Sequence, residues 1–182
     1  MQAAAELLAS GPLGRIGLRE IAARAGVSVG TVTYHFDSVD EILDQAFAQE
    51  VTSYYVRLEQ EVRATDDPVA ALRLLTASTF NDVTARHWQL WLHNLQGRNV
   101  GGTVGGQADR YQQWDSMIAD LLERGVGAGT FRCDDIDRGR ILLAAVVDGL
   151  SLRYLRGGLS MTRAREHFED AAAQLLGLDP RR

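Results

Sequence analysis

The sequence lacks several features that would place it in other classes of protein. Its single cysteine, Cys133, excludes an intramolecular disulfide framework, and one thiolate cannot by itself form a metal site. Only three of its 182 residues are proline, and it has neither a signal-peptide pattern nor an apolar run long enough to cross a membrane. Because both patterns are missing, we expect a soluble cytoplasmic protein, and the hydrophobic content of 46% predicts a substantial core.

The spacings of catalytic and metal sites are also missing. The four histidines, at positions 35, 87, 93 and 167, show no metal-ligand spacing with cysteine or carboxylates, and no nucleophile motif is present. The glycine-rich residues 97–106 follow a predicted helix and lack the Lys-Ser/Thr ending of a phosphate loop, so we interpret them as a mobile loop. These patterns predict that the protein is not an enzyme and uses no cofactor or metal.

Lysine is absent, which bears on nucleic-acid binding. All 19 basic residues are arginine, and with 24 acidic residues the formal net charge is −5. Residues 1–50 hold three arginines and seven acidic residues, a net charge of −4. Arginine can bind phosphate or guanine in a bidentate manner, but a negative segment attracts no DNA at long range. Charge alone therefore opposes DNA binding by this segment.

Apolar residues recur at helical spacing along most of the chain. Turn residues such as Gly11-Pro12 and Asp66-Asp67-Pro68 separate the segments. The pattern predicts two short helices within residues 18–36 and further helices over about 2–9, 38–63, 68–83, 85–96, 107–125, about 20 residues from Asp135 or Asp137, and 161–176. We therefore predict an all-α fold of about nine helices.

The two short helices within residues 18–36 are hinged at Gly26. Leu18, Ile21, Ala22 and Ala25 form one apolar stripe. Gly26 supplies a left-handed turn, and Ser28 is placed to cap the second helix. That helix buries Val32 and Phe36, and it exposes Val29, Gly30, Thr31, Thr33, Tyr34 and His35. The spacing fits a helix-turn-helix, whose second helix enters a major groove, and equally an ordinary packed helical hairpin.

Particular residues decide between these two interpretations. The string Leu-Arg-Glu-Ile-Ala-Ala-Arg-Ala-Gly-Val-Ser at 18–28, then Gly30-Thr-Val and His35-Phe36, resembles the DNA-binding domain of the TetR family of bacterial repressors. The resemblance implies a small helix-turn-helix head over residues 1–46 and a larger ligand-binding and dimerisation body over 47–182. It also implies a set of DNA contacts, namely Arg19, Ser28, Val29, Gly30, Thr31, Thr33, Tyr34 and His35.

The sequence departs from the family pattern at two positions. Thr33 stands where the family usually has tyrosine, and Val39 where it usually has lysine; both are phosphate contacts in relatives. We therefore predict weaker or more sequence-dependent DNA binding than is usual. Relatives also begin with a basic arm several residues earlier, so either the arm is absent here or this start is late. The alternative to a DNA-binding repressor is a ligand-sensing helical dimer with weak DNA affinity that acts through a protein partner.

The helix from Asp135 or Asp137 is apolar on more than one side. Such a helix is usually buried on more than one side, so we predict that it pairs with a second copy and, with the last helix, forms a four-helix bundle. The resemblance implies the same homodimer. The Gly129-Thr-Phe-Arg segment and the Asp148-Gly-Leu triplet also resemble the ligand domain of choline-responsive and related repressors.

Aromatic and aliphatic residues of the central helices predict a ligand pocket. The candidate lining residues are Phe80, Trp88, Trp91, Leu92, Leu95, Tyr111, Trp114, Met117 and Ile118. Aromatic residues at this spacing also occur in plain cores, and no cationic cluster accompanies them. We therefore expect a small, largely apolar or planar effector that releases a dimeric repressor from a palindromic operator.

Overall fold

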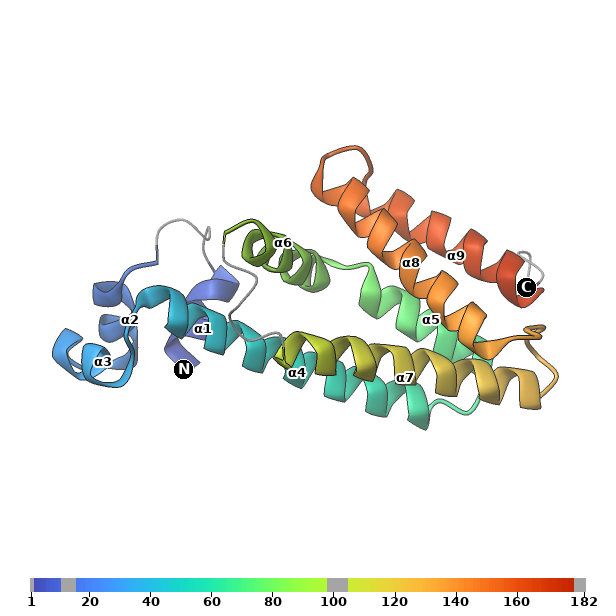
Figure 1. The fold of residues 1–182 in the computed structure, drawn as a ribbon, viewed down its shortest axis with the longest axis horizontal. Coiled ribbons are helices and arrows are strands. Elements are labelled where there is room, and N and C mark those ends of the chain that lie inside the picture. Colours follow the sequence, from blue (N-terminus) through green and yellow to red (C-terminus); the bar gives the residue numbers. More distant parts are fainter. Residues whose placement is uncertain (1, 11–15, 98–104, 179–182) are drawn as a thin grey trace. The chain divides into compact units, whose positions relative to one another are not determined.

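The computed structural model describes residues 2–10, 16–97 and 105–178, and these ranges are helical with no strand (Figure 1). The described ranges contain α1 (Gln2–Ser10), α2 (Leu18–Ala25), α3 (Val29–His35), α4 (Val39–Ala64), α5 (Pro68–Thr79), α6 (Asp82–Gly97), α7 (Gly105–Gly127), α8 (Ile136–Leu155) and α9 (Met161–Leu176). The predicted all-α fold is confirmed. The chain divides into two compact units, Met1–Tyr54 and Tyr55–Arg182. From here on, the head and the body mean these two units and not the ranges that the resemblance implies.

Several predicted helix starts are confirmed by the side chains that cap them. The Ser28 hydroxyl accepts a hydrogen bond from the Thr31 amide, and the Asp135 carboxylate accepts one from Arg138. At α4, the Ser38 hydroxyl accepts from the Glu41 amide at 3.1 Å, while the Glu41 carboxylate reaches the Asp37 amide at 2.8 Å. These bonds satisfy amides that have no partner within their own helix.

Two predicted boundaries were wrong. The helix expected to end at residue 83 ends at Thr79, because Asn81 interrupts it: its side-chain oxygen accepts from the Thr84 amide at 3.0 Å and so starts α6 early. Gly97 and Gly105, which we placed in a loop, are helical, so the glycine pattern overstated the length of that connection. Residues 98–104 of the predicted loop lie outside the described residues.

The head encloses a small core between α1, α2, α3 and the first part of α4. Its buried apolar side chains include Ala4, Leu7, Ile21, Ala22, Val32, Ile42, Ala46 and Val51. Two predicted details were wrong or incomplete: Ala25 of the apolar stripe is exposed, and Phe36, which we expected to be buried with Val32, is only half-buried. Ala25 directly precedes the turn, where the chain leaves the packed face.

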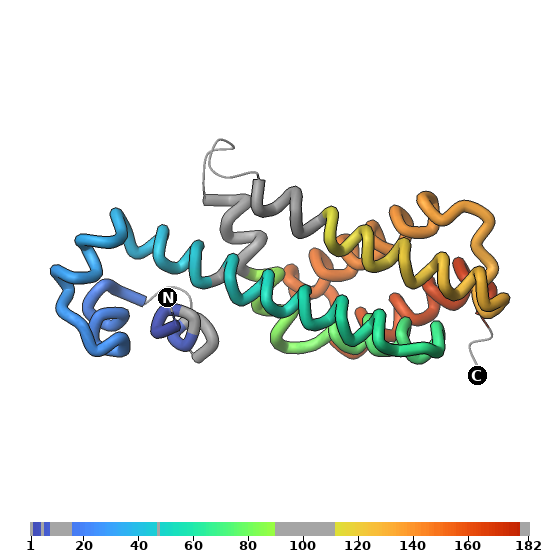
Figure 2. Tube along the Cα trace, turned by 90° about the horizontal axis from the view of Figure 1, so that it is seen from below, coloured from blue at the N-terminus to red at the C-terminus, as the bar shows by residue number. Residues whose placement is uncertain are grey.

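The body has a larger core formed by α5, α7, α8, α9 and the end of α4. Its fully buried side chains include Val62, Leu75, Met117, Ile118, Leu121, Leu122, Leu143, Phe168 and Leu176. Helices α8 and α9 lie side by side in both views of the chain (Figures 1 and 2). Within the described residues, no helix combines the length and apolarity needed to span a membrane.

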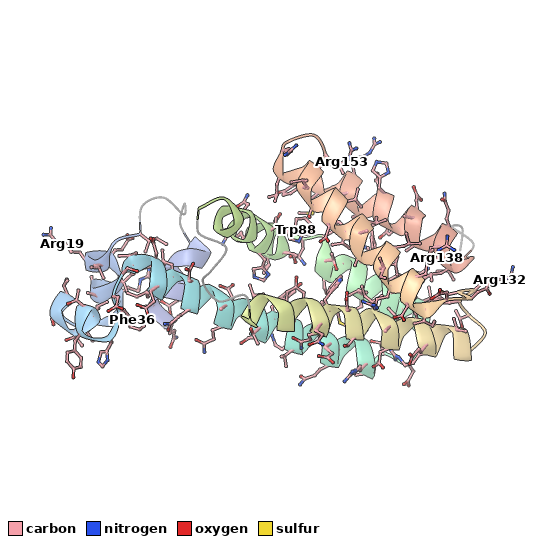
Figure 3. All side chains as sticks on the ribbon, viewed as in Figure 1. Arg19, Phe36, Trp88, Arg132, Arg138 and Arg153 are labelled. Atoms are coloured by element: carbon pink, nitrogen blue, oxygen red, sulfur yellow. The ribbon has the colours of Figure 1, made fainter. Side chains whose placement is uncertain are left out.

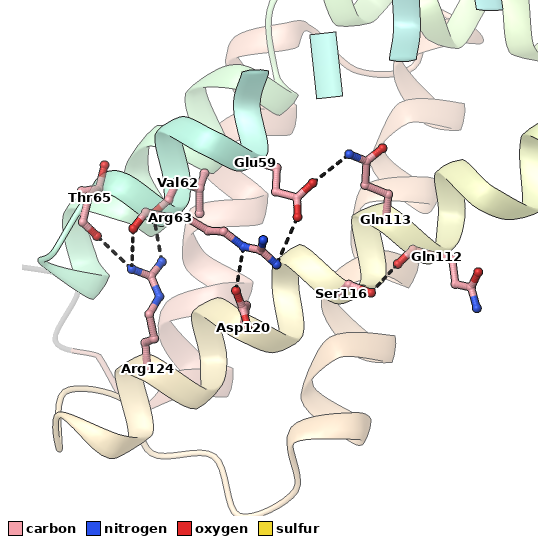
Figure 4. Close-up of polar contacts among 9 residues, drawn as sticks. All are labelled: Glu59, Val62, Arg63, Thr65, Gln112, Gln113, Ser116, Asp120 and Arg124. Carbon is pink, nitrogen blue, oxygen red and sulfur yellow. Dashed lines mark hydrogen bonds and ion pairs between the residues drawn. The ribbon is translucent and has the colours of Figure 1, made fainter. Parts of the chain in front are cut away.

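Polar side chains fasten the end of α4 to α7 (Figure 4). The Arg124 guanidinium donates to the main-chain oxygens of Val62 at 2.9 Å and Thr65 at 3.0 Å. Arg63 forms an ion pair with Asp120 at 2.9 Å, and the Gln113 amide donates to Glu59 at 2.8 Å. Arg124 thus ties carbonyls at the end of α4 to α7, and it is a second donor to the Val62 carbonyl, which also accepts from the Thr65 amide.

Candidate DNA-binding and ligand-binding sites

The turn between α2 and α3 has the geometry that the sequence predicts. Gly26 adopts φ 69° and ψ 27°, the left-handed conformation that residues with a side chain resist. The Val27 amide donates to the Ala22 carbonyl at 3.0 Å, which closes the end of α2. The Val27 side chain is 43% exposed and so does little to fill the angle between the helices. Backbone geometry, more than side-chain packing, therefore sets this turn.

Helix α3 presents one continuous exposed surface. Val29, Gly30, Thr31, Thr33, Tyr34 and His35 are all exposed, as expected, and only Val32 of this helix is buried. Tyr34 is 84% exposed and contacts the His35 ring edge to face at 5.0 Å. This surface is short, mostly uncharged and free of bulky aliphatic groups, so it can approach a groove closely.

The hydroxyl groups on this surface bond within the helix. The Ser28 and Thr31 hydroxyls lie 2.9 Å apart, and the Ser28 hydroxyl also accepts from the Thr31 amide at 3.0 Å. The Thr33 hydroxyl donates toward the carbonyls of Val29 and Gly30, each at 3.2 Å. These contacts fix the orientation of both threonine side chains.

The two described arginines of the helix-turn-helix differ in their surroundings. Arg24 forms an ion pair with Glu6 of α1 at 3.2 Å. Arg19 is exposed, extends away from α2 (Figure 3), and forms no ion pair among the described residues. Arg19 is therefore the head's available cation among the described residues, and the negative charge that the sequence shows is not offset by an arginine cluster.

The structure brings together two of the residues that the sequence predicts to line a ligand pocket, Phe80 and Trp88. Phe80, Trp88, Met117 and Ile118 are buried, and the rings of Phe80 and Trp88 are 5.7 Å apart. Trp114 is half-buried, and its ring lies 5.8 Å from that of Tyr55. The side chains of Trp91, Leu92, Leu95 and Tyr111 lie outside the described residues. The pocket therefore stays a prediction.

Two aromatic residues that the prediction omitted join Phe80 and Trp88. Phe168 of α9 lies 5.3 Å from Phe80, and Tyr154 of α8 lies 6.1 Å from Trp88, which faces α8 (Figure 3). Sequence reasoning assigned both α8 and α9 to the dimer interface. Their helical spacing could have placed Phe168 with the buried Ala164 and Ala172, but it could not show which helix they face.

Two titratable groups of the body have shifted pKa values. Burial lowers the pKa of His87 to about 4, so this imidazole is neutral at physiological pH. Burial, and secondly the charge of Asp115, raise the pKa of Asp148. Asp115 itself pairs with Arg140, which also pairs with Asp137 at 3.3 Å.

A groove of about 730 Å³ lies elsewhere on the body, between α5, α9 and the turn that follows α7. Its lining includes apolar or small residues, among them Leu72 and Ala172, and the charged residues Arg73, Arg165, Glu169 and Asp170. None of the nine predicted ligand residues lines it. The groove is therefore not the pocket that the sequence predicts.

The helix-turn-helix with its exposed second helix, followed by a helical body, defines a DNA-binding transcriptional regulator. Residues 1–46 match the family model of bacterial regulatory proteins of the tetR family, and residues 68–177 match the C-terminal model of BetI-type transcriptional repressors. The chain belongs to the TetR family. This is a family of transcriptional regulators and not of enzymes.

Individual relatives agree with this assignment. The HTH-type transcriptional repressor KstR2 of Mycobacterium tuberculosis H37Rv is 26% identical over 140 residues, covering 75% of this chain and 70% of the relative. A transcriptional regulator from Saccharomonospora viridis, solved in complex with choline, is 26% identical with a TM-score of 0.80 and covers 96% of this chain and 94% of its own. FadR from Bacillus subtilis, solved with stearoyl-CoA, is 17% identical with a TM-score of 0.68 over 96% and 95% of the chains, and supports the fold alone.

Proposed function

We propose that this protein is a ligand-responsive repressor that binds a palindromic operator as a dimer and is released by a small effector. The observation that carries the proposal is the surface of α3, which is exposed among the residues that the structure describes. A helix that is exposed along its whole outer side, directly after a left-handed turn, is placed to enter the major groove.

Each predicted DNA contact has a chemical role in this proposal. Arg19 contacts a base edge or a phosphate, while Tyr34 and His35 contact phosphates. Ser28, Val29, Gly30, Thr31 and Thr33 line the base edges. The domain division at residue 46 belongs to the same proposal, with the operator contacts confined to residues 1–46 and the effector site in the remainder.

A second copy of the chain covers the outer surface of α8. Ile141, Leu142 and Leu152 are 56%, 40% and 37% exposed on that helix, which is unusual for large apolar side chains. The outer surface of α9 carries mainly charged residues, among them Arg163, Glu166 and Asp170. Helix α8 therefore supplies most of the apolar contact, and Ile141→Glu is expected to convert the dimer to monomer in sedimentation equilibrium.

The effector binds beside the buried aromatic residues of the body. The pair of Phe80 and Trp88 supports a largely apolar or planar molecule. Choline is a second candidate, because the Saccharomonospora viridis regulator was solved with it and because cations bind to tryptophan and tyrosine faces. Calorimetric titration with choline and with 3,3-dimethyl-1-butanol, which has the same shape without charge, separates a cationic effector from an apolar one.

Release requires that the effector bind the DNA-competent and DNA-incompetent arrangements with different affinity. Helix α4 transmits the difference, since it begins in the head and its end is held to α7 by Arg124 and Arg63. A shift of α4 changes the separation of the two α3 helices from the roughly 34–36 Å between successive major grooves. An equal separation in free and effector-bound dimers contradicts this mechanism.

The test measures binding of the protein to the DNA upstream of its own coding region, by fluorescence anisotropy across a salt series. Saturable binding of one or two dimers that resists competitor DNA supports the proposal. Val39→Lys is the matched variant, because it restores the family's usual phosphate contact and is expected to steepen the slope of log K against log salt by about 0.9. An equal slope in both proteins contradicts the predicted loss of this contact.

The alternative, a ligand-sensing dimer that acts through a protein partner, is favoured by the net charge of −4 in residues 1–50. It predicts no competitor-resistant binding either to the upstream DNA or to any sequence enriched from a random pool. It also predicts that adding a basic amino-terminal extension does not restore DNA binding. Binding only with the extension would instead attribute the weakness to missing phosphate contacts.

A further inference from the structure

The exposed surface of α3 lacks every side chain that recognises a base through paired hydrogen bonds. Such contacts come from arginine or lysine to guanine, asparagine or glutamine to adenine, and aspartate or glutamate to cytosine. The seven residues of α3, Val-Gly-Thr-Val-Thr-Tyr-His, contain none of these types. Base recognition by this helix must therefore use a different chemistry.

The threonine hydroxyls are poor candidates for that chemistry. The Thr33 hydroxyl directs its proton toward the carbonyls of Val29 and Gly30, both at 3.2 Å, and the Thr31 hydroxyl is paired with Ser28 at 2.9 Å. With the oxygen of Thr33 turned back toward its own helix, its methyl group is held in one orientation on an exposed residue. The side chains of Val29, Thr31 and Thr33 thus offer mainly methyl groups.

We propose that α3 recognises the C5-methyl groups of thymines in its operator half-site. Thymine is the base that presents a methyl group in the major groove, and threonine methyl and other apolar groups are its usual contacts. The bases facing Val29, Thr31 and Thr33 are accordingly T·A pairs, and strong selection for guanine is confined to the base nearest Arg19. This inference rests on the proposed DNA-binding function and adds the chemistry of recognition.

Gly30 supports the proposal independently. A Cβ added at this position would meet only the Ser28 hydroxyl, at 3.7 Å, so packing within the head does not require glycine. Its φ is not in the left-handed region, so the turn does not require it either. Glycine weakens a helix, but it lets the helix backbone approach bases closely, as short methyl-bearing side chains need in order to reach them.

The first experiment uses the full chain and chemically altered DNA. An operator enriched from a random pool is resynthesised with deoxyuridine in place of individual thymidines, which deletes the methyl group and keeps every hydrogen-bonding atom. We expect about three- to fivefold weaker binding for each contacted thymine, the value of one buried methyl group. Unchanged affinity at every thymine, or enriched half-sites dominated by guanine and cytosine, overturns the inference while leaving DNA binding intact. Failure to enrich any sequence instead counts against the proposed function.

A pair of protein variants tests the same point from the other side. Thr33→Ser deletes the methyl group and keeps the hydroxyl, whereas Thr33→Val keeps the methyl and deletes the hydroxyl. We expect the serine variant to bind the thymine operator three- to fivefold more weakly than the valine variant, and this ratio to approach one on the deoxyuridine operator. The reverse order shows that the hydroxyl is the recognised group, and an equal ratio on both operators shows that the thymine methyl group is not what Thr33 contacts; either result overturns the inference.

Discussion

The head and the body use their polar side chains over different distances along the chain. In the head, Ser28, Thr31 and Thr33 form hydrogen bonds with residues three or four positions away, and Arg24 pairs with Glu6, 18 positions away. In the body, Arg124 reaches carbonyls 59 to 62 positions away, and Arg140 pairs with Asp115, 25 positions away. Local bonds leave the surface of α3 available to a partner, whereas long-range bonds hold the body's helices to one another. The head is therefore specified mainly by local sequence, and the body by tertiary contacts.

The largest test of this difference compares an aromatic residue from each unit. Phe168 is 1% exposed and packs on Phe80, so Phe168→Ala is expected to lower the free energy of unfolding by about 3–5 kcal/mol. Tyr34→Ala, at an 84% exposed position, is expected to change it by less than about 0.5 kcal/mol. Urea unfolding followed by circular dichroism measures both. A loss below about 1 kcal/mol for Phe168→Ala would contradict its role in the core.

The long-range polar contacts can be broken in the same way. Arg124→Met removes the donor to the carbonyls at the end of α4, and we expect it to cost about 2–3 kcal/mol of unfolding free energy. The matched control is Arg165→Met, which removes an exposed ion pair with Glu169 four residues away and should cost about 0–0.5 kcal/mol. If both variants unfold at the same urea concentration, the Arg124 contacts do not stabilise the body.

The buried imidazole of His87 gives the body a pH dependence. Its pKa is about 4 in the folded chain against 6.5 in the unfolded chain, so the unfolded state binds more protons between these values. This contribution to stability is fully present above pH 6.5 and is lost as the pH falls toward 4, amounting to about 2 kcal/mol between pH 7 and pH 5.

Measuring the free energy of unfolding of the parent and of His87→Gln at pH 7 and at pH 5 isolates the contribution of His87. We expect the difference between the two proteins to change by that amount, and an unchanged difference would show that His87 does not titrate as described. The raised pKa of Asp148 has the opposite sign, because protonation on acidification relieves its destabilising charge. The comparison with the His87 variant keeps the two contributions separate.

Leaving the control substitutions aside, the smallest expected change in stability among these tests comes from a substitution in the head, Gly30→Ala. Gly30→Ala is expected to raise the free energy of unfolding by about 0.5–1 kcal/mol, because alanine favours helix and the added Cβ meets only one atom at 3.7 Å. The same change should weaken operator binding if α3 approaches the bases closely. Thermal unfolding and anisotropy with the same samples measure both, and a variant that is less stable than the parent would contradict the open surroundings of Gly30.

The sequence could predict features that depend on local contacts, and it could not predict those that depend on contacts between distant parts of the chain. The helix starts at Ser28 and Asp135, the left-handed Gly26 and the exposed residues of α3 were predictable because each depends on neighbours within a few positions. The partnership of Phe80 with Phe168 was not, because periodicity gives the buried side of each helix and not the helix that it meets. The early start of α6 was missed because the Asn81 cap competes with an apolar pattern that continues past it.

The contacts of Arg124 also bear on how this body can change over evolutionary time. They are made to main-chain oxygens at Val62, Arg63 and Thr65, which every amino acid possesses. Side chains at these three positions can therefore be exchanged without removing the hydrogen bonds, provided that the helix itself is retained. The part of the α4–α7 junction that Arg124 forms therefore does not depend on which side chains stand at the three positions that it contacts.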